Sequence, residues 1–160
     1  QRMCQKLGLF TPQDAEVSAS DQLLAVDLLQ LMLNHEADYT NTFVRLTLAM
    51  DGQDGHDLDG TEPLFSSEAF SAWNTRWHAR LDEQAQSRQE AAARMKSANP
   101  FVIPRNALVE AALEAAEAHD MQPFNALLSV LQHPFAPESN IRAYQGVPKD
   151  SRGYMTFCGT

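Results

Sequence analysis

The proline-bounded segment from Asn99 to Asn106 constrains the fold of this chain more than any other feature of its sequence. Its order is Asn-Pro-Phe-Val-Ile-Pro-Arg-Asn. Proline disfavours the α-helical conformation in the residue before it, so we expect extended backbone at Asn99 and Ile103. A helix that approaches from the N-terminal side must therefore end near Ser97. We predict that this segment is a fixed corner between two helical regions.

Three helical patterns occupy the beginning of the chain. The first ends before Gly8, and the second begins at Ser18, which can cap it. Leucine and valine surround most of the second helix, so we expect it to be the most buried of all. Asp38 can cap a third helix that runs to about Met50, with Asn41 on its outer face.

One long helix is predicted from Ser66 or Ser67 to Ser97, that is, over residues 66–97. At about 1.5 Å per residue such a helix would be a rod of about 45 Å. Its apolar stripe includes Trp73 and Trp77, which we interpret as core residues rather than as a platform for a base or a sugar. Its second half has few apolar positions, so we expect it to lean on a surface outside this chain.

The region after the corner is predicted to be a helical hairpin followed by a tail. Asn106 can cap the first helix of the hairpin, which covers residues 107–133, and Pro123 suits the first turn of its second helix. Prolines and glycines over residues 134–160 exclude regular structure there. We therefore predict an all-α fold, an irregular array of about five to six helices with a long irregular C-terminal tail.

The helical segments are expected to form a single domain. Residues 1–97, the corner at 98–106, the hairpin at 107–133 and the tail at 134–160 together have the size of one core. The chain begins at Gln1 with an apparently packed helix end, which indicates a piece of a longer protein. We expect an N-terminal part to be missing.

Charge and cysteine content exclude several classes of partner. The formal net charge of −9 disfavours binding to nucleic acid or to anionic lipid. No apolar run approaches the roughly 20 residues needed to cross a bilayer. Two cysteines are too few for the disulfide framework of a small secreted domain, so we expect a cytoplasmic protein.

No complete active site can be assembled from these residues. The acidic loop 51–62 could attract Ca²⁺, but its acids and glycines do not match the register of a helix–loop–helix calcium site, which favours a solvated loop. His35 and His78 have no partner at ligand spacing, so neither is assigned a catalytic or metal-binding role. Phosphate-binding glycine loops and paired metal cysteines are also missing from the sequence. Cys158, near the end of the tail, is the one accessible chemical group we single out.

Several motifs make the chain resemble the C-terminal part of selenoprotein O family proteins. They are Lys6-Leu7-Gly8-Leu9, Asp38-Tyr39-Thr40, Asn99-Pro100, Arg105-Asn106, Pro123-Phe124 and the ending Phe157-Cys158-Gly159-Thr160. The Asn-Pro, Arg-Asn and Phe-Cys-Gly-Thr elements are specific in combination, and the resemblance spans nearly the whole chain. We assign a structural role to Asn99, Pro100, Arg105 and Asn106.

The resemblance implies a parent enzyme with a kinase-like fold that transfers AMP from ATP to protein hydroxyl groups, using Mg²⁺ or Mn²⁺. The catalytic and nucleotide-binding residues lie upstream in the family and have no counterpart here. The chain by itself is therefore expected to be inactive and to bind no cofactor or metal. Its expected partners are its own N-terminal kinase-like domain and the protein substrates of the parent.

The resemblance also gives Cys158 a meaning. This cysteine stands where animal members of the family carry selenocysteine, and in the family it is linked to a redox-sensitive disulfide with the kinase-like core. Cys4 has no match to the family's redox position, so it is not the expected partner.

Two other functions remain open at the level of sequence. The helical array could be a protein-binding or oligomerisation module without an enzymatic role, because the predicted long helix has little to pack on. A calcium-responsive domain that uses the acidic loop is the weaker alternative.

Overall fold

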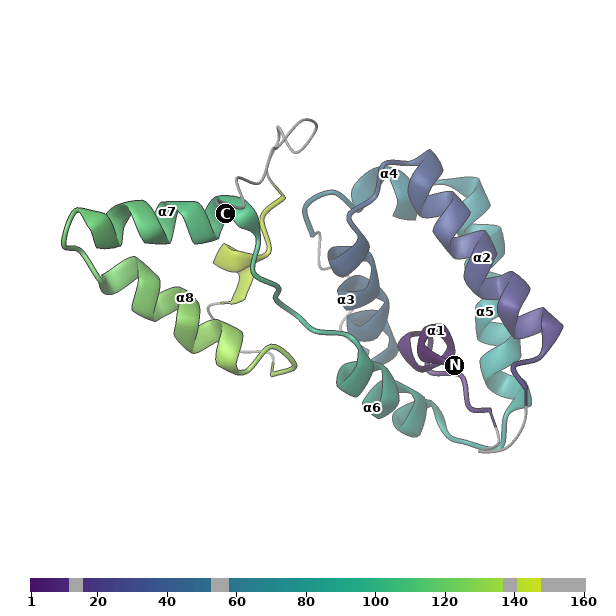
Figure 1. Ribbon diagram of the computed structural model, residues 1–160. Coiled ribbons are helices and arrows are strands. Elements are labelled where there is room, and N and C mark those ends of the chain that lie inside the picture. Colours follow the sequence, from purple (N-terminus) through teal and green to yellow (C-terminus); the bar gives the residue numbers. More distant parts are fainter. Residues whose placement is uncertain (12–15, 53–57, 137–140, 148–160) are drawn as a thin grey trace. The chain divides into compact units, whose positions relative to one another are not determined.

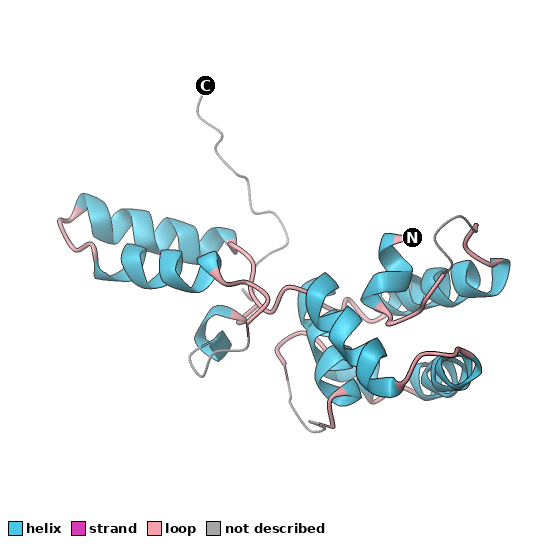
Figure 2. Cartoon of the chain, turned by 90° about the horizontal axis from the view of Figure 1, so that it is seen from below, coloured by secondary structure: helices cyan, strands magenta, loops and turns pink. Residues whose placement is uncertain are grey.

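The computed structural model describes residues 1–11, 16–52, 58–136 and 141–147. Within these ranges the chain is all-helical and contains no β-strand (Figure 2). The longer helices are α2 (Ala19–Asn34), α3 (Tyr39–Met50), α5 (Glu68–Glu83), α6 (Arg88–Ala98), α7 (Asn106–Glu117) and α8 (Gln122–Gln132). The short elements are α1 (Arg2–Lys6), α4 (Glu62–Phe65) and a 3-10 helix, η1 (Ile141–Tyr144). The predicted fold class is confirmed.

The chain divides into two compact units, Gln1–Pro100 and Phe101–Thr160, which we call unit 1 and unit 2. The boundary between them falls inside the predicted corner. Asn99 has φ −114° and ψ 102°, the extended conformation expected of a residue before proline.

Unit 1 is built around two stacked tryptophans. In Figure 1, α1 lies between the pair α2 and α5 and the pair α3 and α6. Trp73 and Trp77 of α5 are each only 1% exposed, and their ring centroids lie 5.5 Å apart. The Trp73 indole donates to the carbonyl of Leu24 in α2 (2.8 Å), and the Trp77 indole donates to that of Leu7 after α1 (2.9 Å). The prediction that both tryptophans belong to the core is confirmed.

The end of α1 is set by Gly8. This glycine has φ +69°, its backbone N–H donates to Gln5, and the next N–H, of Leu9, donates to Cys4. That pair of bonds is the Schellman arrangement, which satisfies carbonyl groups at a helix end. A Cβ added at Gly8 would lie 3.1 Å from both the Cβ and the carbonyl oxygen of Ala91 in α6. Glycine therefore allows α1 to end and also allows α6 to approach it.

The prediction of one long helix over residues 66–97 is wrong, because the chain breaks between α5 and α6. Ser87 and Glu90 form a capping box that starts α6: the Ser87 hydroxyl accepts from the Glu90 N–H (3.2 Å), and the Glu90 carboxylate accepts from the Ser87 N–H (2.8 Å). These hydrogen bonds from Ser87 lower the pKa of Glu90. Gln84 leaves the helix and bridges the segment after α1, donating to the Gly8 carbonyl (3.1 Å) and accepting from the Phe10 N–H (3.2 Å).

The apolar positions in the second half of the predicted rod pack within this chain. In α6, Ala91 and Met95 are fully buried against α1 and α3. Arg94 lies with its guanidinium 4.3 Å from the centroid of the Phe10 ring. These apolar side chains therefore have partners inside unit 1, and the expected contact with an outside surface stays a prediction.

Two expectations about helix faces are also wrong. Only one side of α2 packs in unit 1, so Leu24 is buried while Val26 and Leu33 are 59% and 71% exposed. Asn41, placed on the outer face of α3 by the pattern, is completely buried and donates to the carbonyl of Asp59 (2.9 Å). Both errors arise because the residue pattern of an apolar or mixed helix does not determine which of its faces packs against another element.

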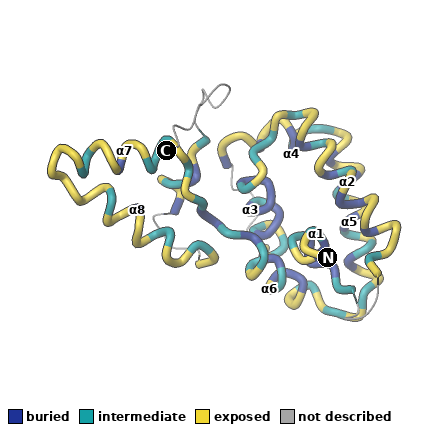
Figure 3. The backbone as a smooth tube through the Cα atoms, in the orientation of Figure 1, coloured by how far each residue is buried: buried dark blue, intermediate teal, exposed yellow. Residues whose placement is uncertain are grey.

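Unit 2 contains the predicted hairpin of α7 and α8, which lie side by side (Figures 1 and 2). Pro123 occupies the first turn of α8, as expected. Asn106 is already the first residue of α7, which begins without a side-chain cap, so the predicted cap by Asn106 is wrong. Figure 3 shows that most of this hairpin is exposed. In the described part of the tail, which was predicted to lack regular structure, the 3-10 helix η1 is present.

Gly8→Ala is expected to destabilise unit 1 by about 2 kcal/mol or more, because a side chain there meets both an unfavourable φ and the backbone of α6. Gly52→Ala is the matched control: its φ is +72°, but apart from its chain neighbours no atom of the described residues lies within 4 Å of the added Cβ. We expect about 1 kcal/mol for that change. Urea unfolding monitored by fluorescence of the two tryptophans, both in unit 1, measures the two values, and equal losses would contradict the role assigned to Ala91.

Candidate functional site

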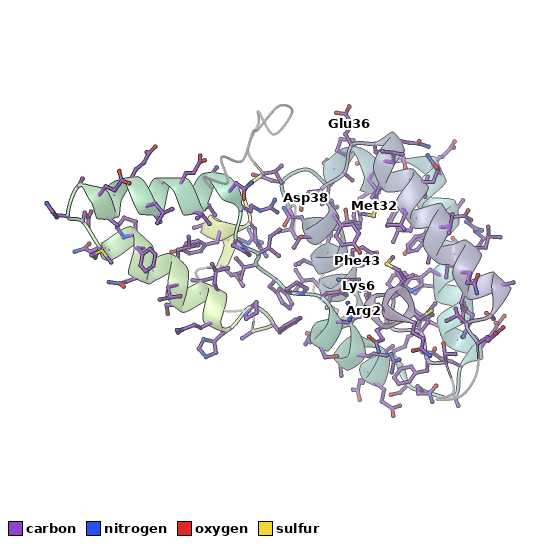
Figure 4. All side chains as sticks on the ribbon, in the orientation of Figure 1. Arg2, Lys6, Met32, Glu36, Asp38 and Phe43 are labelled. Carbon is purple, nitrogen blue, oxygen red and sulfur yellow. The ribbon has the colours of Figure 1, made fainter. Side chains whose placement is uncertain are left out.

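Three motifs that are far apart in the sequence meet in unit 1. They supply Lys6 from α1, Tyr39 and Phe43 from α3, and Asn99 from the end of α6, with Thr47 of α3 beside them. We call these five residues the Lys6–Asn99 cluster. Figure 4 labels Lys6 and Phe43, whose side chains lie next to each other.

The carboxamide of Asn99 is the centre of the cluster and is completely buried. Its nitrogen donates to the backbone carbonyl of Lys6 and to the hydroxyl of Thr47, both at 2.9 Å. Its oxygen accepts from the Lys6 ammonium at 3.2 Å. The Thr47 hydroxyl in turn donates to the carbonyl of Phe43 (2.7 Å). One side chain therefore joins α1, α3 and α6 and satisfies polar groups from each of them.

The ammonium of Lys6 occupies the carbonyl end of α6. It donates to the carbonyl of Ala98 (3.1 Å) and lies 5.6 Å and 5.1 Å from the ring centroids of Tyr39 and Phe43. A cation is favourable both at the negative end of a helix and over an aromatic face. Burial lowers the pKa of Lys6 and raises the pKa of Tyr39. These contacts hold helices together, and we interpret the cluster as structural.

A second polar link joins α2 to α5. The Asp21 carboxylate, in a residue only 2% exposed, accepts two hydrogen bonds from the Arg80 guanidinium, at 2.7 Å and 3.0 Å. This bidentate geometry is the strongest form of an arginine–carboxylate pair. Removing Arg80 would leave the buried Asp21 carboxylate without a compensating charge.

Comparison with known proteins assigns the chain to a family. Residues 1–132 match the family described as Protein adenylyltransferase SelO. The chain belongs to the SelO family. The recognition made from the short motifs of the sequence is thereby confirmed.

The relatives of this SelO family member carry the name Protein nucleotidyltransferase YdiU. The protein from Clostridium beijerinckii is 42% identical over 159 residues, which cover 99% of this chain and 30% of that protein. The protein from Methylorubrum populi is 41% identical over 162 residues, covering 97% of this chain and 32% of the relative. The present chain therefore spans about a third of the length of the curated relatives it matches.

The four residues to which the sequence assigns a structural role in this SelO chain fall into two groups. Asn99 and Pro100 belong to unit 1, where Asn99 is buried in the cluster described above. Arg105 and Asn106 belong to unit 2, where Arg105 is half-buried and Asn106 is exposed. The corner is thus shared between the units, and the structural role proposed for Arg105 stays a prediction.

Cys158, the predicted redox residue, lies outside the described residues. The other cysteine, Cys4, is a free thiol only 3% exposed, in the core of unit 1. A group with so little access to solvent is a poor candidate for exchange with another thiol.

The acidic loop 51–62 is described only in part, because residues 53–57 lie outside the described ranges. Two of its described acids are in ion pairs, Asp51 with Lys96 (2.7 Å) and Glu62 with Arg45 (3.2 Å). Over the described ranges, no group of three histidine, cysteine, aspartate or glutamate side chains is arranged to hold a metal ion. None of the helices in these ranges combines the length and apolar character needed to span a membrane.

The structure shows where His35 and His78 lie in the SelO chain and what His78 contacts. His35 directly follows the last residue of α2. The Nδ1 atom of His78 lies 2.8 Å from the Arg88 guanidinium, and its ring meets the edge of Trp77 at a centroid distance of 5.1 Å. His78 is half-buried and thus lies at the boundary of the core.

The sequence did not reveal that Lys6, Tyr39 and Thr47 join Asn99. The available signal was the set of motifs behind the resemblance, since Lys6, Tyr39 and Asn99 each belong to one of them. Thr47 belongs to none, and only the folded structure brings its hydroxyl to the Asn99 carboxamide.

Asn99→Ala is expected to destabilise unit 1 by about 2–4 kcal/mol, because it removes the side-chain donor of the Lys6 carbonyl and the bond that the Thr47 hydroxyl accepts. Asn34→Ala removes the same side chain at an exposed position of unit 1 and should change stability by less than about 0.5 kcal/mol. Tryptophan fluorescence during urea unfolding compares the two variants. A loss for Asn99→Ala as small as that for Asn34→Ala would show that the carboxamide is not central to unit 1.

Proposed function

We propose that residues 1–160 form the helical C-terminal region of a protein adenylyltransferase, which transfers AMP from ATP to serine, threonine or tyrosine hydroxyl groups of proteins. The observation that carries this proposal is the match of residues 1–132 to the family described as Protein adenylyltransferase SelO. The relatives' name, Protein nucleotidyltransferase, supports the same class of reaction.

The proposal includes a division of labour within the parent protein. The resemblance assigns ATP binding and Mg²⁺ or Mn²⁺ binding to an N-terminal kinase-like domain, so no catalytic role is given to the residues described here. The matched relatives extend well beyond this region, which covers 30% of the Clostridium beijerinckii protein. The contacts of Asn99 and Lys6 support a scaffold, because they cap and join helices. The scaffold packs on the kinase-like domain and carries Cys158.

The proposed reaction has a chemical outcome that separates it from phosphorylation. A hydroxyl oxygen of the substrate protein attacks the α-phosphorus of ATP. The bond between the α-phosphorus and the oxygen that bridges to the β-phosphate breaks, and pyrophosphate leaves. The modified protein therefore carries the α-phosphate of ATP, whereas the γ-phosphate leaves in the pyrophosphate.

The full-length protein is therefore expected to label proteins with ATP carrying radioactive phosphorus at the α-position, and not with ATP labelled at the γ-position. The 160-residue chain alone should label nothing with either nucleotide. Gel autoradiography of the four reactions checks both statements. Transfer of radioactive phosphate from the γ-position would indicate a kinase activity instead of AMP transfer. Labelling by the isolated chain would refute the division of labour.

We further propose that Cys158 is a redox element of the full-length protein in the reducing cytoplasm, where two cysteines in this region are compatible with free thiols. Support comes from the resemblance, in which the matching position carries selenocysteine in animal members.

In the full-length protein, Cys158 is expected to react with a maleimide after reduction and to lose most of that reactivity after mild oxidation. Mass spectrometry of the C-terminal peptide measures the labelled fraction, with Cys158→Ser as the blank. Cys4 serves as the internal reference, because its burial should keep its labelling low in both states. Equal labelling of Cys158 at every oxidant level would show that it is no switch.

A further inference from the structure

An apolar stripe runs along the side of α2 that faces away from the core of unit 1. It consists of four large side chains that are 56%, 59%, 38% and 71% exposed, at Leu23, Val26, Leu29 and Leu33. Spacings of three and four residues keep these side chains on one face of the helix, over a length of about 15 Å. We call this set the outer α2 stripe. Figure 3 shows α2 with both buried and exposed positions along its length, consistent with a helix that is apolar on two sides.

The stripe carries no charge. The two charged residues of α2 are Asp21 and Asp27, and each is paired with an arginine of α5, Asp21 with Arg80 (2.7 Å) and Asp27 with Arg76 (2.8 Å). Both acids therefore belong to the side of α2 that meets α5. The outer face carries leucine and valine together with two exposed, uncharged glutamines, Gln22 and Gln30.

The neighbouring helix α5 gives an internal comparison. It has the same length as α2, 16 residues, and also packs one face into the core. Its exposed positions include Glu68, Thr75 and Glu83, and this fully described helix exposes none of its large apolar side chains. A helix face that meets water usually has such polar character, whereas a helix that is apolar all round is usually buried. The outer face of α2 therefore resembles a contact surface.

We propose that the outer α2 stripe is the surface through which this region docks on the kinase-like domain of the same polypeptide. The inference rests on the proposed function, because that function supplies the domain. The length of the relatives supports the choice of occupant, since this region covers only 30% of the Clostridium beijerinckii protein and 32% of the Methylorubrum populi protein.

The size of the stripe favours a domain of the same chain over a second copy of the protein. Stable interfaces between separate chains involve roughly 20–30 residues per partner, and the stripe offers four large apolar residues. Two separate molecules must also overcome the loss of translational and rotational freedom. A covalently linked domain is already at high effective concentration, so a small apolar contact is sufficient.

The stripe also defines the chemistry of the surface that it meets. A charged group buried against leucine and valine would lose its hydration without gaining a partner. The docking surface on the kinase-like domain is therefore apolar and uncharged.

Cysteine labelling of the full-length protein tests this proposal. Val26→Cys and Leu33→Cys place thiols on the stripe, and Ala72→Cys places one at an exposed position of α5 as the matched control. All three are made in a Cys158→Ser background, and mass spectrometry follows maleimide labelling of the relevant peptides in the full-length protein and in the isolated 160-residue chain. Tryptophan fluorescence verifies that unit 1 is folded in each variant.

We expect the two stripe thiols to react at least about tenfold more slowly in the full-length protein than in the isolated chain, because labelling there requires local opening. The Ala72→Cys thiol should react at the same rate in both. Equal rates at the stripe in both proteins would overturn the proposal. Slow labelling of the stripe thiols in the isolated chain would also overturn it. If dilution restores fast labelling, a second copy of the chain covers the stripe. If it does not, another part of residues 1–160 covers it.

These outcomes are independent of those that test the proposed activity. Protection of the stripe without AMP transfer would refute the proposed function while retaining the docking surface. AMP transfer with an unprotected stripe would refute the docking surface alone.

Discussion

The architecture of unit 1 depends on how the ends of α1 and α6 are satisfied beside α3, and the Asn99 side chain performs most of that task. The carboxamide offers two donor hydrogens and an acceptor oxygen in one plane, and all three functions are used. An aspartate at this position would lack both donors, and a glutamine would move them by one methylene group. The position therefore requires asparagine for reasons of shape and polarity together.

The polar contacts of unit 1 complement its apolar core in a particular way. Trp73 and Trp77 supply much of the buried surface, but apolar packing alone leaves the register of neighbouring helices weakly defined. The indole hydrogen bonds to Leu24 and Leu7 and the ion pair of Asp21 with Arg80 each fix one helix against another. Three of the motifs behind the resemblance supply further contacts between helices, through Lys6, Tyr39 and Asn99.

Local signals in the sequence predicted much of the fold, and non-local contacts decided the rest. Ser18 and Asp38 accept the capping bonds expected of them, because a cap depends on residues three positions away. The break between α5 and α6 was missed although Ser87 and Glu90 have the spacing of a capping box. What completes it is Gln84, whose partners Gly8 and Phe10 are 76 and 74 residues away in the chain. The partners of Asn99 are similarly remote, so Pro100 could reveal the corner but not the cluster.

The two sides of α2 also show what the sequence alone does not determine, because both faces are rich in leucine and only one of them is buried in unit 1. The remote pairing of Asn99 has a further consequence for synthesis on the ribosome. The carbonyl of Lys6 receives its hydrogen bond from a residue 93 positions later. At a translation rate of about 5–20 residues per second, α1 emerges roughly 5 to 20 s before that partner exists. During that interval Leu7 and Leu9, fully buried in the finished unit, have no completed core to enter and stay exposed to non-native contacts.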